Sequence, residues 1–279
     1  MKRASVMFVM SFVYCVVIGQ SLQTLRPPPY LSLNTYSLKH VDAGSMLTNQ
    51  AALTQVEGIE IALYGERRFF LNELNLYQLA AAFGTRYGNF GVSARYFGGI
   101  LFNEALIGLA YARRFGVRVD IGIQFNYNGM GFAGYGKSSA VGFEIGSIFH
   151  LSEKLHAGIR ASNPIETKYG PGKLRAIYSM GFGYETSDKF LVSIEFNKET
   201  NAPINIIGGF QYQMLPSIHF KMGVSTGTTS YWMGTGIFWK SCRIDVTSSY
   251  NPQLGISPGI LLAIKVNKRS AEKVDGADG

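Results

Sequence analysis

Polar and apolar residues alternate without interruption along residues 116–128, and this stretch shows the pattern that dominates the chain. Its apolar positions are Val117, Val119, Ile121, Ile123, Phe125 and Tyr127. The positions between them are polar or small and comprise Arg118, Asp120, Gly122, Gln124, Asn126 and Asn128. Because side chains on a strand point alternately to its two faces, the pattern predicts a β-strand with one apolar and one polar face.

The same alternation recurs in segments of roughly 9–12 residues between residues 58 and 267, a length that suits a tilted strand crossing a bilayer. We expect about fourteen strands, an even number as in bacterial single-chain barrels. A soluble β-sandwich also alternates, but its Greek-key connections rarely allow so many consecutive strands joined by tight turns. The pattern favours an all-β fold, a transmembrane antiparallel up-and-down β-barrel with lipid outside and a polar lumen. Ile121 is expected near the middle of the membrane.

Most of the charge falls on the polar faces of these segments. An Arg or Lys that faces lipid at mid-depth costs about 2–4 kcal/mol, so charges are expected to collect inside the barrel. The residues predicted to line the lumen are Arg95, Arg118, Asp120, Gln124, Glu144, Arg160, Glu195, Lys221, Arg243 and Asp245.

The connections alternate between tight turns and longer loops, with the longest loops expected at 128–137 and 163–172. Short periplasmic turns and longer external loops are usual in outer-membrane barrels, so we expect both termini in the periplasm. Residues Gly129–Gly136 are rich in glycine but lack the helix and the Lys-Ser/Thr pair of a phosphate-binding loop. We interpret them as a flexible external loop.

The two ends of the chain differ from the strand pattern. Lys2 and Arg3 precede an apolar run from Val6 to Ile18, which is too short to span a membrane as a helix and predicts a removable signal peptide over residues 1–20. The mature chain would then keep one cysteine, Cys242, and no internal disulfide. Residues 268–279 are polar and are expected to form a disordered periplasmic tail.

Residues 21–57 do not show strand alternation. They contain the stiff run Arg26-Pro27-Pro28-Pro29-Tyr30 and many small residues. Because many inward positions of the barrel are Gly, Ala or Ser, the lumen has room for this segment. We expect it either to plug the lumen or to hang in the periplasm, with the plug residues Asn49, Gln50, Ala51 and Leu53.

Composition limits the partners. The formal net charge is +8, and loss of Lys2 and Arg3 would leave about +6. The basic residues are spread over the strands rather than clustered with aromatics, so nucleic acid is not expected as a partner. We expect outer-membrane lipid, lipopolysaccharide and the barrel-assembly machinery as partners.

The histidines are the candidate catalytic or metal-binding residues. His150, His156 and His219 are expected to face the lumen as hydrogen-bonded fillers, and His40 with Asp42 shows no metal-ligand spacing. We predict no enzyme, no metal and no cofactor.

Two short motifs resemble the fatty-acid-transporter-like outer-membrane barrels, a superfamily that includes barrels associated with type IX secretion in Bacteroidetes. Thr48-Asn49-Gln50-Ala51-Ala52-Leu53 is similar to their Asn-Pro-Ala-x-Leu signature, with Gln50 in place of proline, and Ser162-Asn163-Pro164 is similar to a strand-end element. The resemblance covers about residues 35–267. It implies fourteen strands and an N-terminal segment inside the lumen.

Three functions stay open at this stage. The first is an outer-membrane barrel that passes or binds a small solute, which could be hydrophobic, and is gated by its N-terminal segment. The alternative is a non-enzymatic accessory barrel that holds subunits of a protein-secretion machine at the outer membrane. A lumen-gated enzyme is the least favoured, because no residue pattern supports it.

Overall fold

The computed structural model describes residues 26–266, apart from residues 32, 135, 166, 171 and 228–229 and the side chain of Pro29. The expected signal peptide and C-terminal tail lie outside the described residues. No helix within the described part of the chain is long and apolar enough to cross a membrane.

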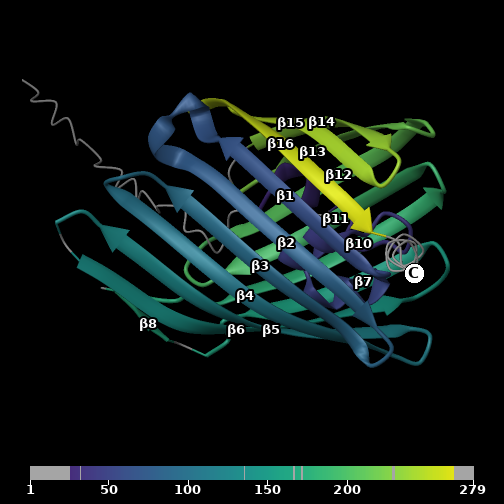
Figure 1. The fold of residues 1–279 in the computed structure, drawn as a ribbon, viewed down its shortest axis with the longest axis horizontal. Helices are drawn as coiled ribbons and strands as arrows, with labels where there is room; N and C mark the ends of the chain where they lie inside the picture. The colour runs from purple at the N-terminus through teal and green to yellow at the C-terminus, as the bar shows by residue number, and fades with distance from the viewer. Residues whose placement is uncertain are drawn as a thin grey trace, which may run out of the picture.

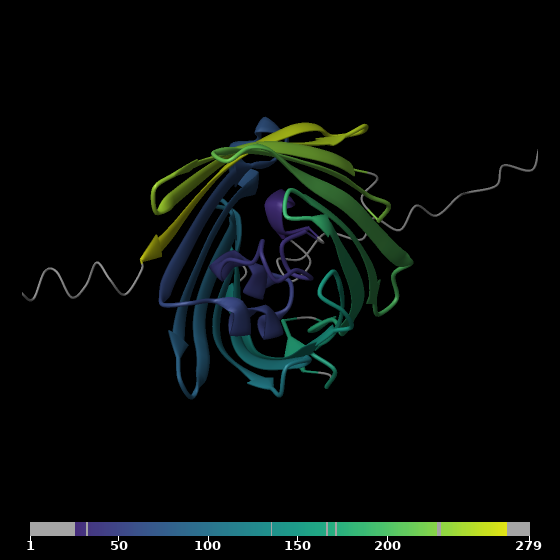
Figure 2. The same cartoon turned by 90° about the vertical axis from the view of Figure 1, so that its right-hand side faces the viewer.

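Fourteen antiparallel strands close into a single barrel, and the ladder between β1 and β16 completes the ring (Figures 1 and 2). Each strand pairs with the strands before and after it in the sequence, and β7 pairs with β10. The exception is the closure, where the first strand, β1, pairs with the last, β16. The strands are β1 Ile59–Arg67, β2 Asn75–Thr85, β3 Gly88–Gly98, β4 Phe102–Phe115, β5 Val119–Phe132, β6 Gly136–His150, β7 Leu155–Ser162, β10 Ile177–Ser187, β11 Phe190–Glu199, β12 Ile204–Leu215, β13 Ile218–Ser225, β14 Ser230–Trp239, β15 Cys242–Asn251 and β16 Gly255–Val266. The predicted fold class is confirmed.

The outer wall is apolar and the inner wall polar, as the alternation predicts. In β5, Asp120 and Gln124 are buried, whereas Phe125 and Tyr127 are exposed. Exposed Leu, Ile, Val, Phe and Tyr side chains cover the outside of strands all around the barrel. A soluble protein rarely exposes so large an apolar surface, which is the surface that a lipid bilayer covers.

The two ends of the barrel differ. The short-turn end holds the two- to four-residue turns after β2, β4, β6, β10, β12 and β14, together with the start of β1 and the end of β16. The long-connection end holds the others, including 3-10 turns η4 Arg68–Phe70 and η5 Asn72–Leu74 and a small hairpin of β8 Lys168–Tyr169 and β9 Gly172–Lys173.

Two sequence expectations about connections are wrong. Residues 128–132 are not loop but the end of β5, and they pair with 136–140 of β6, for example Asn128 with Ala140. The flexible external loop expected at Gly129–Gly136 is therefore mostly a paired hairpin. At the other end, residues Gly116–Arg118 form the turn before β5, so Ile121 lies near the end of its strand rather than at its middle.

The N-terminal segment, residues 26–57, lies inside the barrel (Figure 2, purple). It contains three short 3-10 helices: η1 Pro28–Tyr30, η2 Ala43–Leu47 and η3 Gln50–Gln55. Asp42 and Asn49 cap η2 and η3, each accepting a hydrogen bond from the backbone N–H two residues on. Because most of the segment is buried, it is part of the protein's core rather than a free periplasmic arm.

Candidate functional site

Nine of the ten residues predicted to line the lumen are buried on its inner face. They are Arg95, Asp120, Gln124, Glu144, Arg160, Glu195, Lys221, Arg243 and Asp245. The tenth, Arg118, lies in the exposed turn before β5, because the alternation extends over residues 116–118 whereas the strand begins only at Val119. The inner wall therefore carries charge of both signs, which must be paired where water is excluded.

The second half of the N-terminal segment is fixed to one side of the lumen, the wall of β3–β7. Asn49 donates hydrogen bonds to the carbonyls of Ser147 and Ile159, at 3.3 and 3.1 Å. Gln50 Nε2 donates to Glu144 Oε2 at 3.1 Å, and η3 packs against β3–β6 with Ala51 and Leu53 buried.

Inward glycines make room for the segment. A Cβ added to Gly122 would lie 2.6 Å from the backbone of Gln50 and Ala51, and one added to Gly183 would lie 1.9 Å from the carbonyl of Tyr36. Backbone at these distances leaves no space for any side chain larger than hydrogen. The close approach of segment and wall therefore depends on glycine at these positions.

Buried acids on β10 and β11 hold the first half of the segment. Glu195 pairs with Arg26 and accepts a hydrogen bond from the Tyr36 hydroxyl at 3.2 Å. Burial lowers the pKa of Arg26, but the adjacent Glu195 carboxylate raises it, and the net shift is upward. Glu185 accepts from the Ser37 hydroxyl and from the backbone of Leu38. An exposed ion pair between Lys39 and Asp188 adds a further link at the rim.

A buried charged cluster joins the segment to the opposite wall. Arg243 pairs with Asp42 of the segment at 2.6 Å and with Asp245 at 3.1 Å. Lys221 and His219 also approach Asp245, at 3.4 and 3.2 Å. We call Asp42, Lys221, Arg243 and Asp245 the charged septum, since they extend from the segment to β13 and β15.

The lumenal histidines lie in a second polar network near the short-turn end. His150 Nε2 lies 2.8 Å from Asp120, and His150 Nδ1 lies 3.0 Å from His156 Nδ1. Arg114 and Gln55 also bond to Asp120. Among the described residues, no group of His, Cys, Asp and Glu has the arrangement of a metal site.

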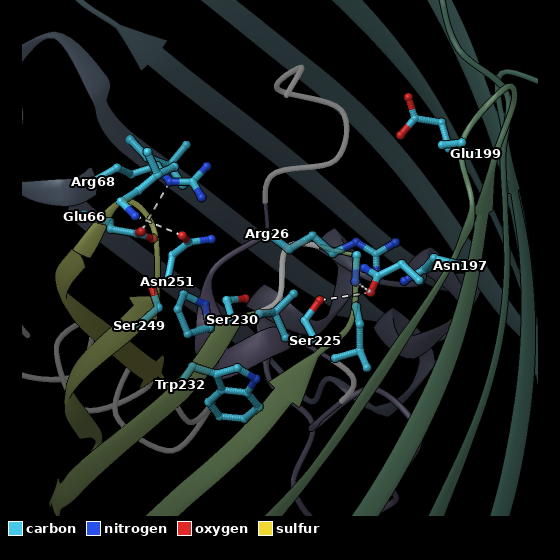
Figure 3. Close-up of a pocket in the computed structure, with 18 of the residues that line it drawn as sticks. Arg26, Glu66, Arg68, Asn197, Glu199, Ser225, Ser230, Trp232, Ser249 and Asn251 are labelled. Carbon is cyan, nitrogen blue, oxygen red and sulfur yellow. Dashed lines mark hydrogen bonds and ion pairs between the residues drawn. The ribbon is translucent and has the colours of Figure 1, made fainter. Parts of the chain in front are cut away.

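A cavity of about 450 Å³, which we call the upper cavity, opens within the lumen at the long-connection end (Figure 3). Its apolar lining includes Leu76, Ile177, Ile207 and Trp232, and the N-terminal segment forms its floor with Pro28 and Leu31. Polar and charged side chains border it as well, namely Arg26, Glu66, Arg68, Arg175, Asn197, Glu199, Asn205, Ser225, Ser230, Ser249 and Asn251. A space of this size and mixed lining suits a small, largely apolar molecule.

A second cavity, of about 290 Å³, lies at the short-turn end, and we call it the lower cavity. Segment residues 39–43 form one side, and β14–β16 and β1 form the other, with Phe238 and Arg243 among the lining residues. The two cavities thus lie on opposite sides of the N-terminal segment, along the same part of the wall.

Sequence reasoning missed the residues that shape the upper cavity. Trp232 is only 2% exposed and faces inward between outward Tyr231 and Met233. The alternation carried this signal, because an inward tryptophan interrupts an otherwise small or polar face. Arg26, Pro28 and Leu31 carried no such signal, since the segment that contains them has no period from which a facing direction could be deduced.

No protein-family model matches the sequence, and no curated protein is significantly similar to it. Solved structures do share its fold. CymD, a monoaromatic hydrocarbon channel, superposes with a TM-score of 0.65 at 16% identity, covering 85% of this chain and 97% of CymD.

Two further barrels are similar. The Pseudomonas putida toluene transporter TodX gives a TM-score of 0.61 at 8% identity, covering 84% of this chain and 95% of TodX. A Pseudomonas aeruginosa FadL homologue gives 0.56 at 11% identity, covering 85% and 96%. At these identities the similarity establishes the fold alone, a closed outer-membrane-type β-barrel.

Proposed function

We propose that this protein is an outer-membrane channel for a small hydrophobic solute, closed at rest by its N-terminal segment. The observation that carries the proposal is the upper cavity, a space of mixed apolar and polar lining that opens inside the lumen and ends on the segment. The apolar outer wall supports a membrane location, and the names of the similar barrels support passage of a hydrocarbon or a compound of similar character.

The size of the cavity limits the solute. A volume of about 450 Å³ falls within the range for small-molecule sites, and such sites combine apolar walls with a few polar groups. Trp232, Ile207 and Leu76 offer the apolar walls, whereas Asn197, Ser225 and Ser230 offer hydrogen-bonding groups at the rim. A monoaromatic compound, with or without one polar substituent, fits this lining.

The alternative of a secretion accessory is favoured by no observation on the described residues. That function requires the N-terminal segment or the loops to be free for partners, yet residues 26–56 are mostly buried in the lumen. No enzymatic function is proposed. The lipid, lipopolysaccharide and assembly partners remain expectations that follow from a membrane location.

Uptake by intact cells tests the proposal. Gram-negative cells that express the full chain should accumulate a radiolabelled monoaromatic hydrocarbon faster than cells without it. Ala202→Trp, which fills the cavity from the β11–β12 connection, should reduce uptake toward the background. Ala133→Trp, an equal change in the exposed β5–β6 turn, is the matched control and should have no effect. Uptake that is unchanged by Ala202→Trp would contradict the proposal.

A further inference from the structure

We propose that the solute crosses the lumen axially, along the wall of β12–β16, and that the Asp42–Arg243 ion pair is the gate on this route. The inference rests on the proposed function and adds to it the path and the closing contact. It starts from the position of the two cavities, which border the same strands from opposite sides of the charged septum.

The inner faces of β14 and β15 lead from one cavity to the other. Along β14, Ser230 and Trp232 line the upper cavity and Phe238 lines the lower one. Along β15 the corresponding residues are Ser249 above and Arg243 below. Between these positions lies Gly236, where an added Cβ would be 2.1 Å from both Asp245 and His219. Along β15, Asp245 and Arg243 of the septum therefore lie between Ser249 of the upper cavity and the lower cavity, which Arg243 and Asp42 border directly.

The segment is attached unevenly, and this decides which part of it can move. Its η3 half packs on β3–β6 and is hydrogen-bonded there through Asn49 and Gln50. On the β12–β16 side, η1 contacts β14 and β15, and Asp42 provides the ion pair to Arg243. A route along β12–β16 opens by displacement of residues 40–43 around Asp42, while η3 and the contacts of Tyr36, Ser37 and Leu38 with β10 and β11 stay in place.

The wall offers no competing exit at this depth. Among the described pairs from β12 through β16 to β1, the ladders are continuous, and the register shifts only beside the turn after β12, between Gln213 and Leu215. Continuous hydrogen bonding closes the wall to lateral passage. The axial route through the septum is therefore the one that needs no strand separation.

The charges of the septum are balanced. Two carboxylates face two cations, and all four groups are buried. Removal of Asp42 would leave Asp245 alone with Lys221 and Arg243. An unbalanced buried charge is strongly unfavourable, so the closed arrangement is well defined even though a buried ion pair adds little net stability. Asp42 also borders the lower cavity, whose lining includes Lys39, Lys240 and Lys265.

The two oxygens of Asp42 allow a clean test. Oδ1 caps η2 by accepting from Gly44 N at 2.8 Å, and Oδ2 pairs with Arg243. Asparagine caps helices as well as aspartate does, so Asp42→Asn keeps the cap and removes the ion pair. In planar bilayers, this variant of the full chain should show an open probability raised by about tenfold or more, since coupling between such contacts is commonly of this size.

Matched variants complete the experiment. Glu73→Gln removes an exposed carboxylate in η5 that lines neither cavity, and it should leave conductance unchanged. Arg243→Gln and the double variant Asp42→Asn/Arg243→Gln should open the channel to a similar extent as Asp42→Asn, because contacts within one pair are not additive. Heat-modifiable mobility on gels checks that each barrel is folded.

Two results would overturn the inference: conductance of folded Asp42→Asn equal to that of the wild type, or fully additive effects in the double variant. Both leave the proposed function intact if uptake still falls in Ala202→Trp. Loss of that effect would remove the proposed function, whatever the conductance of Asp42→Asn.

Discussion

At the scale of the residue, depth along a strand decides the cost of a charge on the outer wall. Ile107 and Ile121 are both exposed on this wall, at 54% and 37%. Ile107 lies in the middle of β4, whereas Ile121 is the third residue of β5, near the short-turn end. An arginine near a strand end can extend its guanidinium to water, but one at the middle cannot.

The same substitution at the two sites should therefore differ in effect. Ile107→Arg should destabilise the folded barrel by about 2–4 kcal/mol and impair assembly, whereas Ile121→Arg should cost roughly 0–1 kcal/mol. Urea unfolding of both variants in lipid vesicles measures the difference. Equal costs would mean that the two positions do not differ in depth, and would contradict the strand boundaries on which the membrane placement depends.

At the scale of the element, the position of the N-terminal segment is fixed by backbone-to-backbone contact with the wall. Tyr36 lies against Gly181 and Gly183 of β10: its ring occupies the space of a side chain at Gly181, and its carbonyl and Cβ occupy that of a side chain at Gly183. Burial raises the pKa of Tyr36 well above its usual value, so its hydroxyl stays neutral as the donor to Glu195. The segment is thus held by shape as well as by hydrogen bonds.

Gly183→Ala should displace the segment locally, since the new Cβ would lie 1.9 Å from the Tyr36 carbonyl and this backbone cannot be accommodated by a rotamer change. Hydrogen exchange at residues 34–40 should become faster, with the strands unchanged. Gly208→Ala, where the nearest atom to the new Cβ is 3.9 Å away, is the matched control. Unchanged exchange in Gly183→Ala would show that the segment is not held by this contact.

At the scale of the whole molecule, the sequence predicts the barrel well because a single rule, alternation with period 2, governs every strand. The ends of the strands were harder to predict from the sequence. Gly129 and Gly131 favour a loop by composition, yet Ser139 and Lys137 pair with them, and only the partner strand decides this. Composition also cannot show that Arg118 lies in a turn.

The residues of the candidate site could not be predicted in the same detail as the strands. Asp42, Lys221 and Arg243 are far apart in the sequence, and they meet because barrel closure and the path of the segment bring them together. The segment has no period, so nothing in it indicates which residue faces which wall. Alternation predicted that Arg243, Asp245 and Lys221 point inward; it could not predict which cavity each would border.

The orientation of the barrel in the membrane is the remaining property of the whole molecule, and it determines from which side a solute enters. The upper cavity opens at the long-connection end, and such ends face outward in barrels of this kind. In a Cys242→Ser background, Ala133→Cys lies at the long-connection end and Glu153→Cys in the turn after β6 at the opposite end. A membrane-impermeant maleimide added to intact cells should label Ala133→Cys and should label Glu153→Cys only after permeabilisation. Reversed labelling would place the upper cavity on the periplasmic side, and the septum would then close the entrance rather than the exit of the route.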